Sequence, residues 1–277
     1  MKPPIAVLAE FAVHSPQHIT DTPIASVWRV RRGDGTFAAL KIYKDDNFQD
    51  EAPGFDLLAA QEGRGAAYLY ARARSAVLME WLDGPLLGDL TRSGDDASAT
   101  LVLMETGNRL HQMPVKTIES LDPLDNRFRA LFDATFSDDC PSGAEATIRK
   151  ACGLAKVLLA NQTNIRPLHG DFHHDNVKGS ERGYLAFDAK GVLGERTFEF
   201  ANAFRNPLGV EEFSGRPEII LKRAEIWSAG LDVSQDHLLS WAAAYSALSL
   251  SWTHKSSFDA GISKDVELID TFLSLMG

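Results

Sequence analysis

Two short segments in the second half of the chain carry the side chains best suited to chemistry. The first is His169–Asn176 (HGDFHHDN), in which Asp171 and Asn176 stand five positions apart, and the second is an apolar run that ends in Asp188. Transfer of a phosphoryl group to a hydroxyl needs an acceptor for the hydroxyl proton and metal ions that neutralise the phosphate charge. We therefore expect Asp171 to accept the proton, and Asn176 and Asp188 to bind Mg²⁺ through oxygen atoms.

The spacing of these residues supports this chemistry. Protein kinases place a catalytic Asp and a metal-binding Asn as Asp-x-x-x-x-Asn, and their main Mg²⁺ ligand is an Asp that ends an apolar strand. Gly191, three residues after Asp188, lets the backbone turn sharply.

Three histidines in the loop offer an alternative. His169, His173 and His174 lie within six residues and would suit a Zn²⁺ site. The helical H-E-x-x-H arrangement is absent, and an Asp/Asn pair suits a hard ion better. We therefore expect His169 and His173 to brace the loop by hydrogen bonds.

A lysine in the first part of the chain completes the set. Lys41 stands in the apolar run Ala38–Ile42, where strand alternation directs it to one face. In a kinase this Lys contacts the nucleotide phosphates and is held by a Glu of the next helix, for which Glu51 is the candidate and Glu62 the reserve. Taken alone, each residue has a simpler interpretation: Lys41 as a solvent-facing residue, Glu51 as an exposed helix residue and Asp188 as a turn residue. Their order along the chain favours a kinase.

The elements that must position these residues begin with strands. A turn containing Asp34-Gly35 joins two alternating runs and predicts a β-hairpin. We expect the first hairpin to pair Ser26–Arg32 with Thr36–Lys44 and a second hairpin to pair Ala66–Arg72 with Ala76–Trp81. Between the two hairpins we expect a helix at Phe48–Gln61. We expect a hinge at Met79–Leu82, with main-chain groups of Glu80 and Leu82 meeting the adenine and Met79 behind it.

Beyond Leu90 the apolar spacing becomes helical. Repeats at i, i+3 or i+4, and i+7 predict core-packed helices, around 124–132, 148–159 and 238–252. Ser234 is placed to cap the last of these, and Pro217 suits the first turn of the helix before it. The range 166–187 interrupts the helices as strand, loop and strand, which predicts an embedded hairpin.

These elements define the expected fold class. It is α+β, a two-lobed protein-kinase-like fold with a small β-rich N-terminal lobe and a larger α-helical C-terminal lobe. The lobes are expected at residues 1–82 and 83–277, because Asp83-Gly84-Pro85 is a turn-rich boundary.

Composition limits the partners. The 277 residues include 28 basic and 38 acidic side chains, for a formal net charge of −10. This charge disfavours nucleic acid and would attract a cationic small molecule, although acidic surfaces also simply keep cytosolic proteins soluble. Cys140 and Cys152 are too few for a disulfide scaffold. No window resembles a signal peptide or a transmembrane helix, and we expect a cytoplasmic protein without a membrane partner. The sequence does not decide between a monomer and a homodimer.

The motifs resemble a known group. His169-Gly170-Asp171-x-His173-x-x-Asn176 is similar to the catalytic loop of the aminoglycoside phosphotransferase and choline kinase superfamily. Phe187–Gly191 with Gly194 resembles the metal-binding strand of its streptomycin 6-phosphotransferase and hydroxyurea phosphotransferase branch. Further similar stretches extend over most of the chain, at Ser26–Val30, Leu40-Lys41, Glu62–Ala66, Asn206-Pro207 and Leu248–Trp252.

The resemblance implies transfer of the γ-phosphate of ATP to a hydroxyl of a small molecule. Asp171 would then be the base or the residue that orients the hydroxyl, and Asn176 and Asp188 would hold Mg²⁺. The chain departs from the branch at Ala189, where Pro is frequent, and at Glu199, where Asp is usual. The turn at 21–26 lacks Gly, as in this family, and Ser26 is the candidate there for covering the phosphates.

The acceptor stays open at this point. A streptomycin-like aminoglycoside and a housekeeping metabolite are both compatible with the motifs. A nucleotide-binding pseudokinase with a regulatory role is the alternative from another class, although pseudokinases typically lose a base or metal residue that this chain keeps. Asp175, Glu195 and Glu199 lie near the loop and the metal strand and are candidates for attracting a cationic acceptor, or equally for turn and capping roles.

Overall fold

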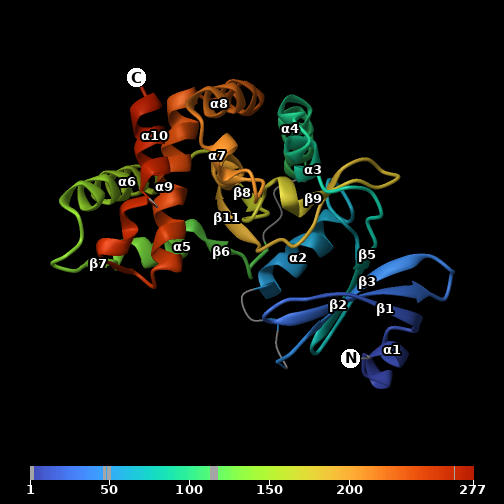
Figure 1. The fold of residues 1–277 in the computed structure, drawn as a ribbon. Helices are drawn as coiled ribbons and strands as arrows, with labels where there is room; N and C mark the ends of the chain where they lie inside the picture. Colours follow the sequence, from blue (N-terminus) through green and yellow to red (C-terminus); the bar gives the residue numbers. More distant parts are fainter. Residues whose placement is uncertain (1–2, 46–47, 49–50, 113–117, 265) are drawn as a thin grey trace.

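The computed structural model describes residues 3–45, 48, 51–112, 118–264 and 266–277. Its N-terminal part is a five-stranded antiparallel sheet in the order β1-β2-β3-β5-β4 (Figure 1). The strands are β1 (Val13–Asp21), β2 (Ala25–Arg32), β3 (Phe37–Tyr43), β4 (Leu69–Ala73) and β5 (Ala76–Glu80), preceded by the short helix α1 (Ile5–Glu10). Both expected hairpins are present.

Two details of this part differ from the expectation. Strand β1 is not predicted by the sequence, because its side chains are mostly polar and exposed and show no apolar alternation. Helix α2 (Ala52–Gln61) begins after Glu51 rather than at Phe48, with Pro53 in its first turn. Pro suits the first turn of a helix and not its interior, which explains the later start. Residues 49–50 of the expected helix lie outside the described residues.

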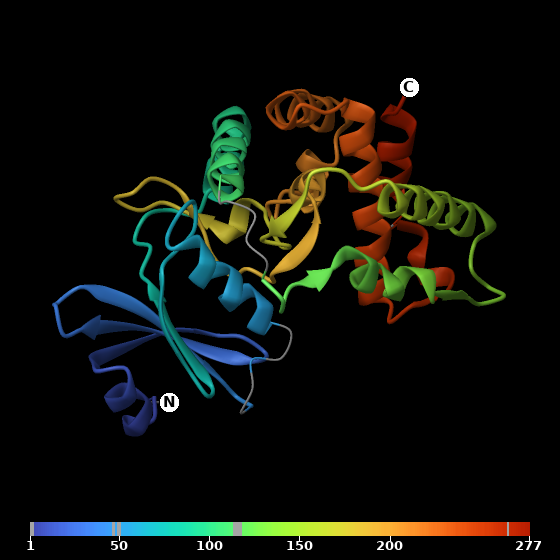
Figure 2. The same cartoon turned by 180° about the vertical axis from the view of Figure 1, so that it is seen from behind.

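The C-terminal part is mostly helical and surrounds one long buried helix. Its helices are α3 (Gly88–Arg92), α4 (Asp96–His111), α5 (Leu124–Phe132), α6 (Ser142–Ala160), α7 (Glu211–Ser214), α8 (Pro217–Leu231), α9 (Gln235–Thr253) and α10 (Glu267–Leu275). Helix α9 contacts α5, α6, α8 and α10 (Figures 1 and 2). As predicted, the Ser234 side chain caps α9 by accepting from the His237 amide at 3.1 Å, and Pro217 opens α8.

The segment that interrupts the helices is more complex than the single hairpin expected. Strand β8 (Ile165–Leu168) pairs with β11 (Val192–Glu195), and β6 (Asp122–Pro123) lies on the other side of β11. The run that was expected to pair with β8 is β10 (Leu185–Ala186), which pairs instead with β9 (Val177–Lys178). The single-hairpin prediction is therefore wrong, because the chain makes two short ladders that hold the loop between them. A further short ladder joins β7 (Thr135–Phe136) and β12 (Ser257–Phe258).

Helix α2 connects the sheet to this interrupting segment. A Cβ on Gly54 would lie 1.8 Å from the Ala189 carbonyl oxygen, and a Cβ on Gly191 would lie 2.3 Å from the Pro53 carbonyl carbon. Only glycine allows the two backbones to approach this closely. The start of α2 is thus packed against the loop that follows Asp188. The boundary between residues 82 and 83 stays a prediction; the sheet ends at Glu80, and α3 begins at Gly88.

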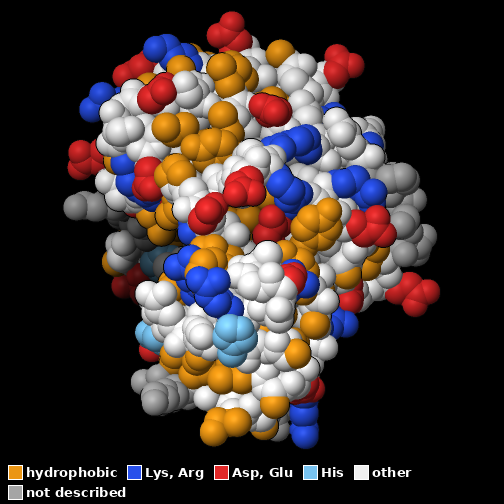
Figure 3. Space-filling view, turned by 90° about the vertical axis from the view of Figure 1, so that its right-hand side faces the viewer, with side chains coloured by type: hydrophobic (Ala, Val, Ile, Leu, Met, Phe, Trp, Pro, Cys, Tyr) orange, Lys and Arg blue, Asp and Glu red, His pale blue; other side chains and the backbone are white. Residues whose placement is uncertain are grey.

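Among the described residues, the face of the molecule shown in Figure 3 has no patch of one charge type that would indicate a particular partner. Figure 3 shows acidic, basic and hydrophobic side chains interspersed over one face rather than gathered by type. No helix of the described ranges has both the length and the apolar composition needed to span a bilayer.

The cap of α9 gives a test of the fold. Ser234→Ala removes the acceptor of the His237 amide, and we expect it to lower the free energy of unfolding by about 1 kcal/mol in urea titration. Ser274→Ala in α10 is the control, because its hydroxyl contacts only a carbonyl of its own helix and Ala is a good helix former. Equal effects of the two substitutions would contradict a capping role.

Candidate active site

Lys41 lies at the centre of a chain of charges. Its Nζ lies 2.6 Å from Glu51 Oε2 and 2.9 Å from Asp188 Oδ1. Lys41 comes from β3, Glu51 from the start of α2, and Asp188 from the loop after β10. The structure therefore brings together the three residues that the sequence placed in a kinase-like order, across up to 147 positions.

The surroundings of Glu51 strengthen this arrangement. Its buried carboxylate also accepts from the Tyr43 hydroxyl and, at 3.2 Å, from Lys190 Nζ. Glu62, the reserve candidate, ends α2 in a left-handed conformation and pairs with Arg64 instead. A carboxylate with three donors is held firmly, so the position of Lys41 is fixed from the side of α2.

The ionisation of Asp188 follows from the same contacts. Burial by itself raises the pKa of Asp188, but the charge of Lys41 and the hydrogen bond from it outweigh burial and hold that pKa below its ordinary value. Asp188 also has φ of +63°, in the left-handed region that Asp tolerates better than most residues. It is therefore an ionised carboxylate on a sharply turned backbone.

Asp171 is held from two sides. Its Oδ1 accepts from Asn202 Nδ2 at 2.8 Å, and Asn176 Nδ2 donates to its carbonyl oxygen at 2.8 Å and to its Oδ2 at 3.1 Å. With the nitrogen of Asn176 used in this way, its amide oxygen is the atom left to meet a cation. Phe187 donates to the Asn176 carbonyl at 3.0 Å, which ties the strand that leads to Asp188 to the same turn.

The histidines brace the loop, as expected. His169 Nδ1 accepts from the Asp171 amide at 3.3 Å, and its Nε2 donates to the Phe187 carbonyl at 2.9 Å. His173 Nδ1 accepts from the Asp175 amide at 3.2 Å. His174 is fully buried beside Trp227, and burial lowers its pKa well below the ordinary value.

A buried glutamate anchors the start of the loop. Glu199 Oε2 accepts from the His169 amide at 2.7 Å, and Oε1 accepts from the Gly170 amide at 2.9 Å. His111 Nε2 lies 3.2 Å from Oε2, and Arg196 donates to the other ring nitrogen, so His111 carries its proton on Nε2 and donates to Glu199. Burial raises the pKa of Glu199, but these donors outweigh it and lower that pKa below the ordinary value.

The hinge residues line a cleft between the sheet and the helical part. The cleft has a volume of about 430 Å³ and reaches from Met79, Glu80 and Leu82 to Lys41 and Asp188. The Glu80 side chain turns away to Arg182 and to the Tyr68 amide. At the turn expected to cover the phosphates, Thr20 and Thr22 line the cleft. Ser26, the earlier candidate, is not among the lining residues and hydrogen-bonds to Asp21 at 2.6 Å.

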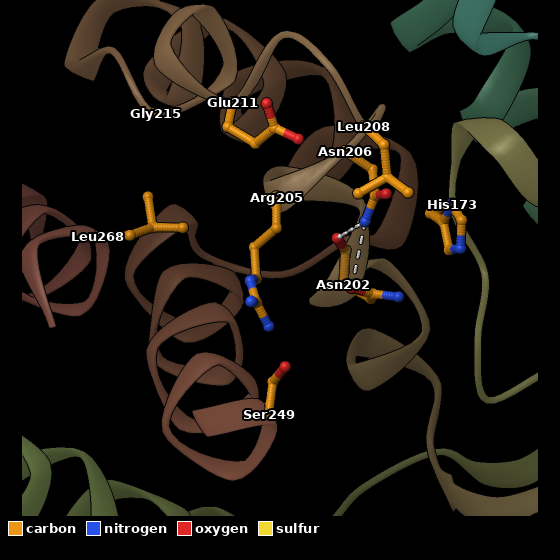
Figure 4. Close-up of a pocket in the computed structure, with 9 residues that line it drawn as sticks. All are labelled: His173, Asn202, Arg205, Asn206, Leu208, Glu211, Gly215, Ser249 and Leu268. Atoms are coloured by element: carbon orange, nitrogen blue, oxygen red, sulfur yellow. Dashed lines mark hydrogen bonds between the residues drawn. The ribbon is translucent and has the colours of Figure 1, made fainter. Parts of the chain in front are cut away.

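A second pocket, of about 400 Å³, is lined by two residues that lie close to Asp171. Its walls include His173, which lies 3.7 Å from Asp171, and Asn202, which donates to it. Figure 4 shows the Arg205 side chain extending into the pocket toward Ser249, with the Glu211 carboxylate on the opposite side. The lining residues are His173, Asn202, Arg205, Asn206, Leu208, Glu211, Gly215, Ser249 and Leu268.

The three acidic residues considered for an acceptor are used elsewhere. Glu195 is buried and accepts from His237 and Trp241, and Glu199 holds the loop amides. Asp175 pairs with Arg92 at 2.6 Å. The carboxylate that does line the pocket, Glu211, follows the loop by some forty positions, and no motif in the sequence marks it.

Two further residues were missed by the sequence argument. Asn202 lies beyond the metal strand with no recognisable spacing to Asp171, so only the fold brings them together. Lys190 stands inside the metal-binding motif, but its pairing with Glu51 depends on the approach of α2.

The donor set of Asn176 and Asp188 fits Mg²⁺. An ionised carboxylate and an amide oxygen are hard ligands, and Mg²⁺ fills its other positions with water and substrate phosphates. Over the described ranges, no three or more His, Cys, Asp or Glu side chains gather as a metal site.

Comparison with known proteins agrees with this geometry. Residues 10–257 match the family described as aminoglycoside/hydroxyurea antibiotic resistance kinase. Streptomycin 3''-kinase of Klebsiella pneumoniae is 38% identical over 232 residues, which cover 80% of this chain and 82% of that protein. Streptomycin 6-kinase of Streptomyces griseus is 27% identical over 221 residues, which cover 78% and 70%.

Solved structures show the fold. A thermostable mutant of the aminoglycoside phosphotransferase APH(4)-Ia, in complex with ADP and hygromycin B, matches with a TM-score of 0.59 at 10% identity and covers 98% of this chain and 97% of that one. The fold is therefore that of the kinase-like small-molecule phosphotransferases, as the sequence predicted. The chain belongs to the aminoglycoside/hydroxyurea antibiotic resistance kinase family.

The anchor of the loop can be tested. In Glu199→Gln the side-chain NH₂ would face a buried donor, so we expect a loss of about 1–3 kcal/mol in the free energy of unfolding and a lower kcat. Chemical denaturation and steady-state kinetics measure the two effects. Glu212→Gln, at an exposed glutamate of α7, is the control and should stay within about 0.5 kcal/mol of wild type. A Glu199→Gln enzyme as stable and active as that control would contradict the anchor.

Proposed function

We propose that the protein transfers the γ-phosphate of ATP to a hydroxyl of a small molecule, with Asp171 as the base or hydroxyl-orienting residue. The observation that carries the proposal is the connection of Asp171 to residues of two cavities. Asn202 and His173, which line the pocket, lie 2.8 and 3.7 Å from the Asp171 carboxylate. Asn176, which donates to the same carboxylate, accepts from the amide of Phe187, and Phe187 lines the cleft with Lys41 and Asp188. A phosphate donor and a hydroxyl acceptor bound in these cavities would meet at the Asp171 carboxylate.

Each residue of the site has one task in this proposal. Main-chain groups of Glu80 and Leu82 meet the adenine, and Lys41, held by Glu51, contacts the phosphates. Asn176 and Asp188 hold Mg²⁺, which when bound neutralises charge on the phosphates. Asn202 keeps the Asp171 carboxylate turned toward the acceptor, where it accepts the proton of the attacking hydroxyl. That ADP is bound in the solved APH(4)-Ia complex supports nucleotide binding by this fold.

We propose a streptomycin-like aminoglycoside as the acceptor. The names of the curated relatives support this class. The pocket offers amides, a hydroxyl and the guanidinium of Arg205 for hydroxyl groups, and the Glu211 carboxylate for a cationic substituent. A hydrogen bond from the Gly209 amide lowers the pKa of Glu211, so this carboxylate is charged at neutral pH. We propose that the reaction takes place in the cytoplasm, where ATP is available, and the free thiols of Cys140 and Cys152 are compatible with this location.

The base is tested by Asp171→Ala and Asp171→Asn. With Mg·ATP and streptomycin, hydroxyurea, choline and amino alcohols as acceptors, we expect kcat to fall by about 10²–10⁴-fold while the KM for ATP changes little. Asp138→Ala, an exposed acidic residue, is the control. Wild-type turnover in either Asp171 variant would refute the assignment, and tight ATP binding without transfer to any acceptor would favour a pseudokinase.

The cationic preference is tested by Glu211→Gln. Gln keeps an oxygen for the Gly209 amide but loses the charge, so we expect the KM for streptomycin to rise by about two- to five-fold, as is typical for an exposed ion pair. The effect should shrink at high salt. The KM for neutral hydroxyurea should not change, and Glu212→Gln should leave both values unchanged. A rise for hydroxyurea equal to that for streptomycin would show that charge is not the cause.

A further inference from the structure

Asp175 and Arg92 enclose one peptide segment of the acceptor pocket. Asp175 Oδ1 accepts from Arg92 Nη2 at 2.6 Å, and Asp175 Oδ2 accepts from the Leu208 amide at 3.0 Å. Arg92 Nε donates to the Leu208 carbonyl at 3.0 Å. Both main-chain polar groups of Leu208 are thus bound by one ion pair, and the Leu208 side chain lines the pocket.

The three segments joined here belong to different parts of the site. Asp175 lies in the turn His174–Asn176, next to the candidate metal ligand, and its own amide is bound by His173. Arg92 ends α3, whose preceding residues Leu86 and Leu87 are held on β9 by main-chain contacts. Leu86 lines the nucleotide cleft. The ion pair therefore links the catalytic turn, the wall of the nucleotide cleft and the wall of the acceptor pocket.

Gly88 supplies independent evidence that this arrangement is built into the fold. A Cβ at this position would lie 2.2 Å from Asp175 Oδ1, 2.8 Å from Pro207 Cβ and 2.9 Å from Arg92 Nη1. The absence of a side chain at Gly88 is what leaves room for the carboxylate and the guanidinium to meet. An ordinary surface ion pair adds little, but here the Asp175 side chain is only 15% exposed, and the pair also satisfies two main-chain groups.

We propose that Asp175 and Arg92 are positioning residues that clamp Leu208 against the catalytic turn and so fix the wall of the acceptor pocket relative to Asp171. The inference rests on the proposed function for its kinetic consequence. The clamp itself does not depend on which acceptor is used. Loss of the clamp leaves Lys41, Asp171 and the hinge in place but lets the Leu208 wall move, so acceptor binding suffers more than nucleotide binding.

The clamp is tested first without an acceptor. Hydrogen exchange of the Leu208 amide is followed by NMR in the full-length protein, in Asp175→Ala and in Gly88→Ala, which displaces the clamp but removes no charge. We expect exchange to be about 10-fold faster or more in both variants. Asp89→Ala is the matched control, because Asp89 also pairs with Arg92, at 2.9 Å, but makes no hydrogen bond with Leu208. Exchange in this variant should stay within about two-fold of wild type. Unchanged exchange in both variants overturns the clamp.

Kinetics then test positioning, with streptomycin as the probe acceptor or, if streptomycin is not phosphorylated, any acceptor found in the screen above. In Asp175→Ala and Gly88→Ala we expect the KM for the acceptor to rise about 10-fold, which is a loss of about 1.4 kcal/mol, while the KM for ATP stays within about two-fold. Equal rises in both KM values, or an unchanged KM for the acceptor, overturn the positioning role. Failure of the whole screen with faster Leu208 exchange overturns the proposed function and leaves the clamp standing. If Asp175→Ala does not fold, Gly88→Ala decides both tests.

Discussion

The buried ion pairs around Lys41 are the interaction on which the rest of the site depends. Lys41 and Glu51 are almost fully buried, and Asp188 completes the set at 2.9 Å. Burial of an unpaired charge is costly, so Lys41 and Glu51 each require the other in place, and the partly exposed Asp188 adds a second carboxylate contact to Lys41. Because the three residues come from the sheet, from α2 and from the loop after β10, this one requirement fixes the sheet against the helical part. The glycine contacts between α2 and the metal loop allow the backbones to come close enough for it.

A second anchor fixes the opposite end of the loop. Glu199 binds the amides of His169 and Gly170, and its own charge is supported by His111. The loop His169–Asn176 is therefore held at its start by the Glu199 carboxylate and at its end by the hydrogen bond from the Phe187 amide to the Asn176 carbonyl. Side chains in rotamers fixed in this way can hold a reacting group in a productive geometry without further rearrangement.

The two cavities differ in the residues that line them. The cleft proposed for the nucleotide is lined by apolar residues such as Met79 and Leu82 at one end and by Lys41 and Asp188 at the other, which suits a planar base at the first end and phosphates at the second. The pocket proposed for the acceptor is formed by η4 (Asn202–Arg205), the following loop, α7, α9, α10 and His173. Its charges are one guanidinium and one carboxylate, with His173 near the base. In the proposed function, specificity for the acceptor therefore depends mainly on residues that lie outside the segments His169–Asn176 and Phe187–Gly191.

The sequence by itself determined the class of protein, a small-molecule kinase, together with the kinase-like fold and the helices with clear periodicity. Lys41, Asp171, Asn176 and Asp188 are recognisable because local spacing and apolar flanks mark them. The sequence did not reveal β1, whose exposed side chains carry no periodic signal, or the true pairing of β8, which depends on a partner far along the chain. Only the tertiary structure decided which acidic residue lines the pocket proposed for the acceptor. Donors from other elements bind the carboxylates of Asp175, Glu195 and Glu199. The carboxylate that lines the pocket is that of Glu211. The physical reason is that tertiary packing decides which donor lies next to a charged side chain. Packing depends on contacts between segments that are far apart in the sequence, so the position of a charge next to a motif does not reveal its partner.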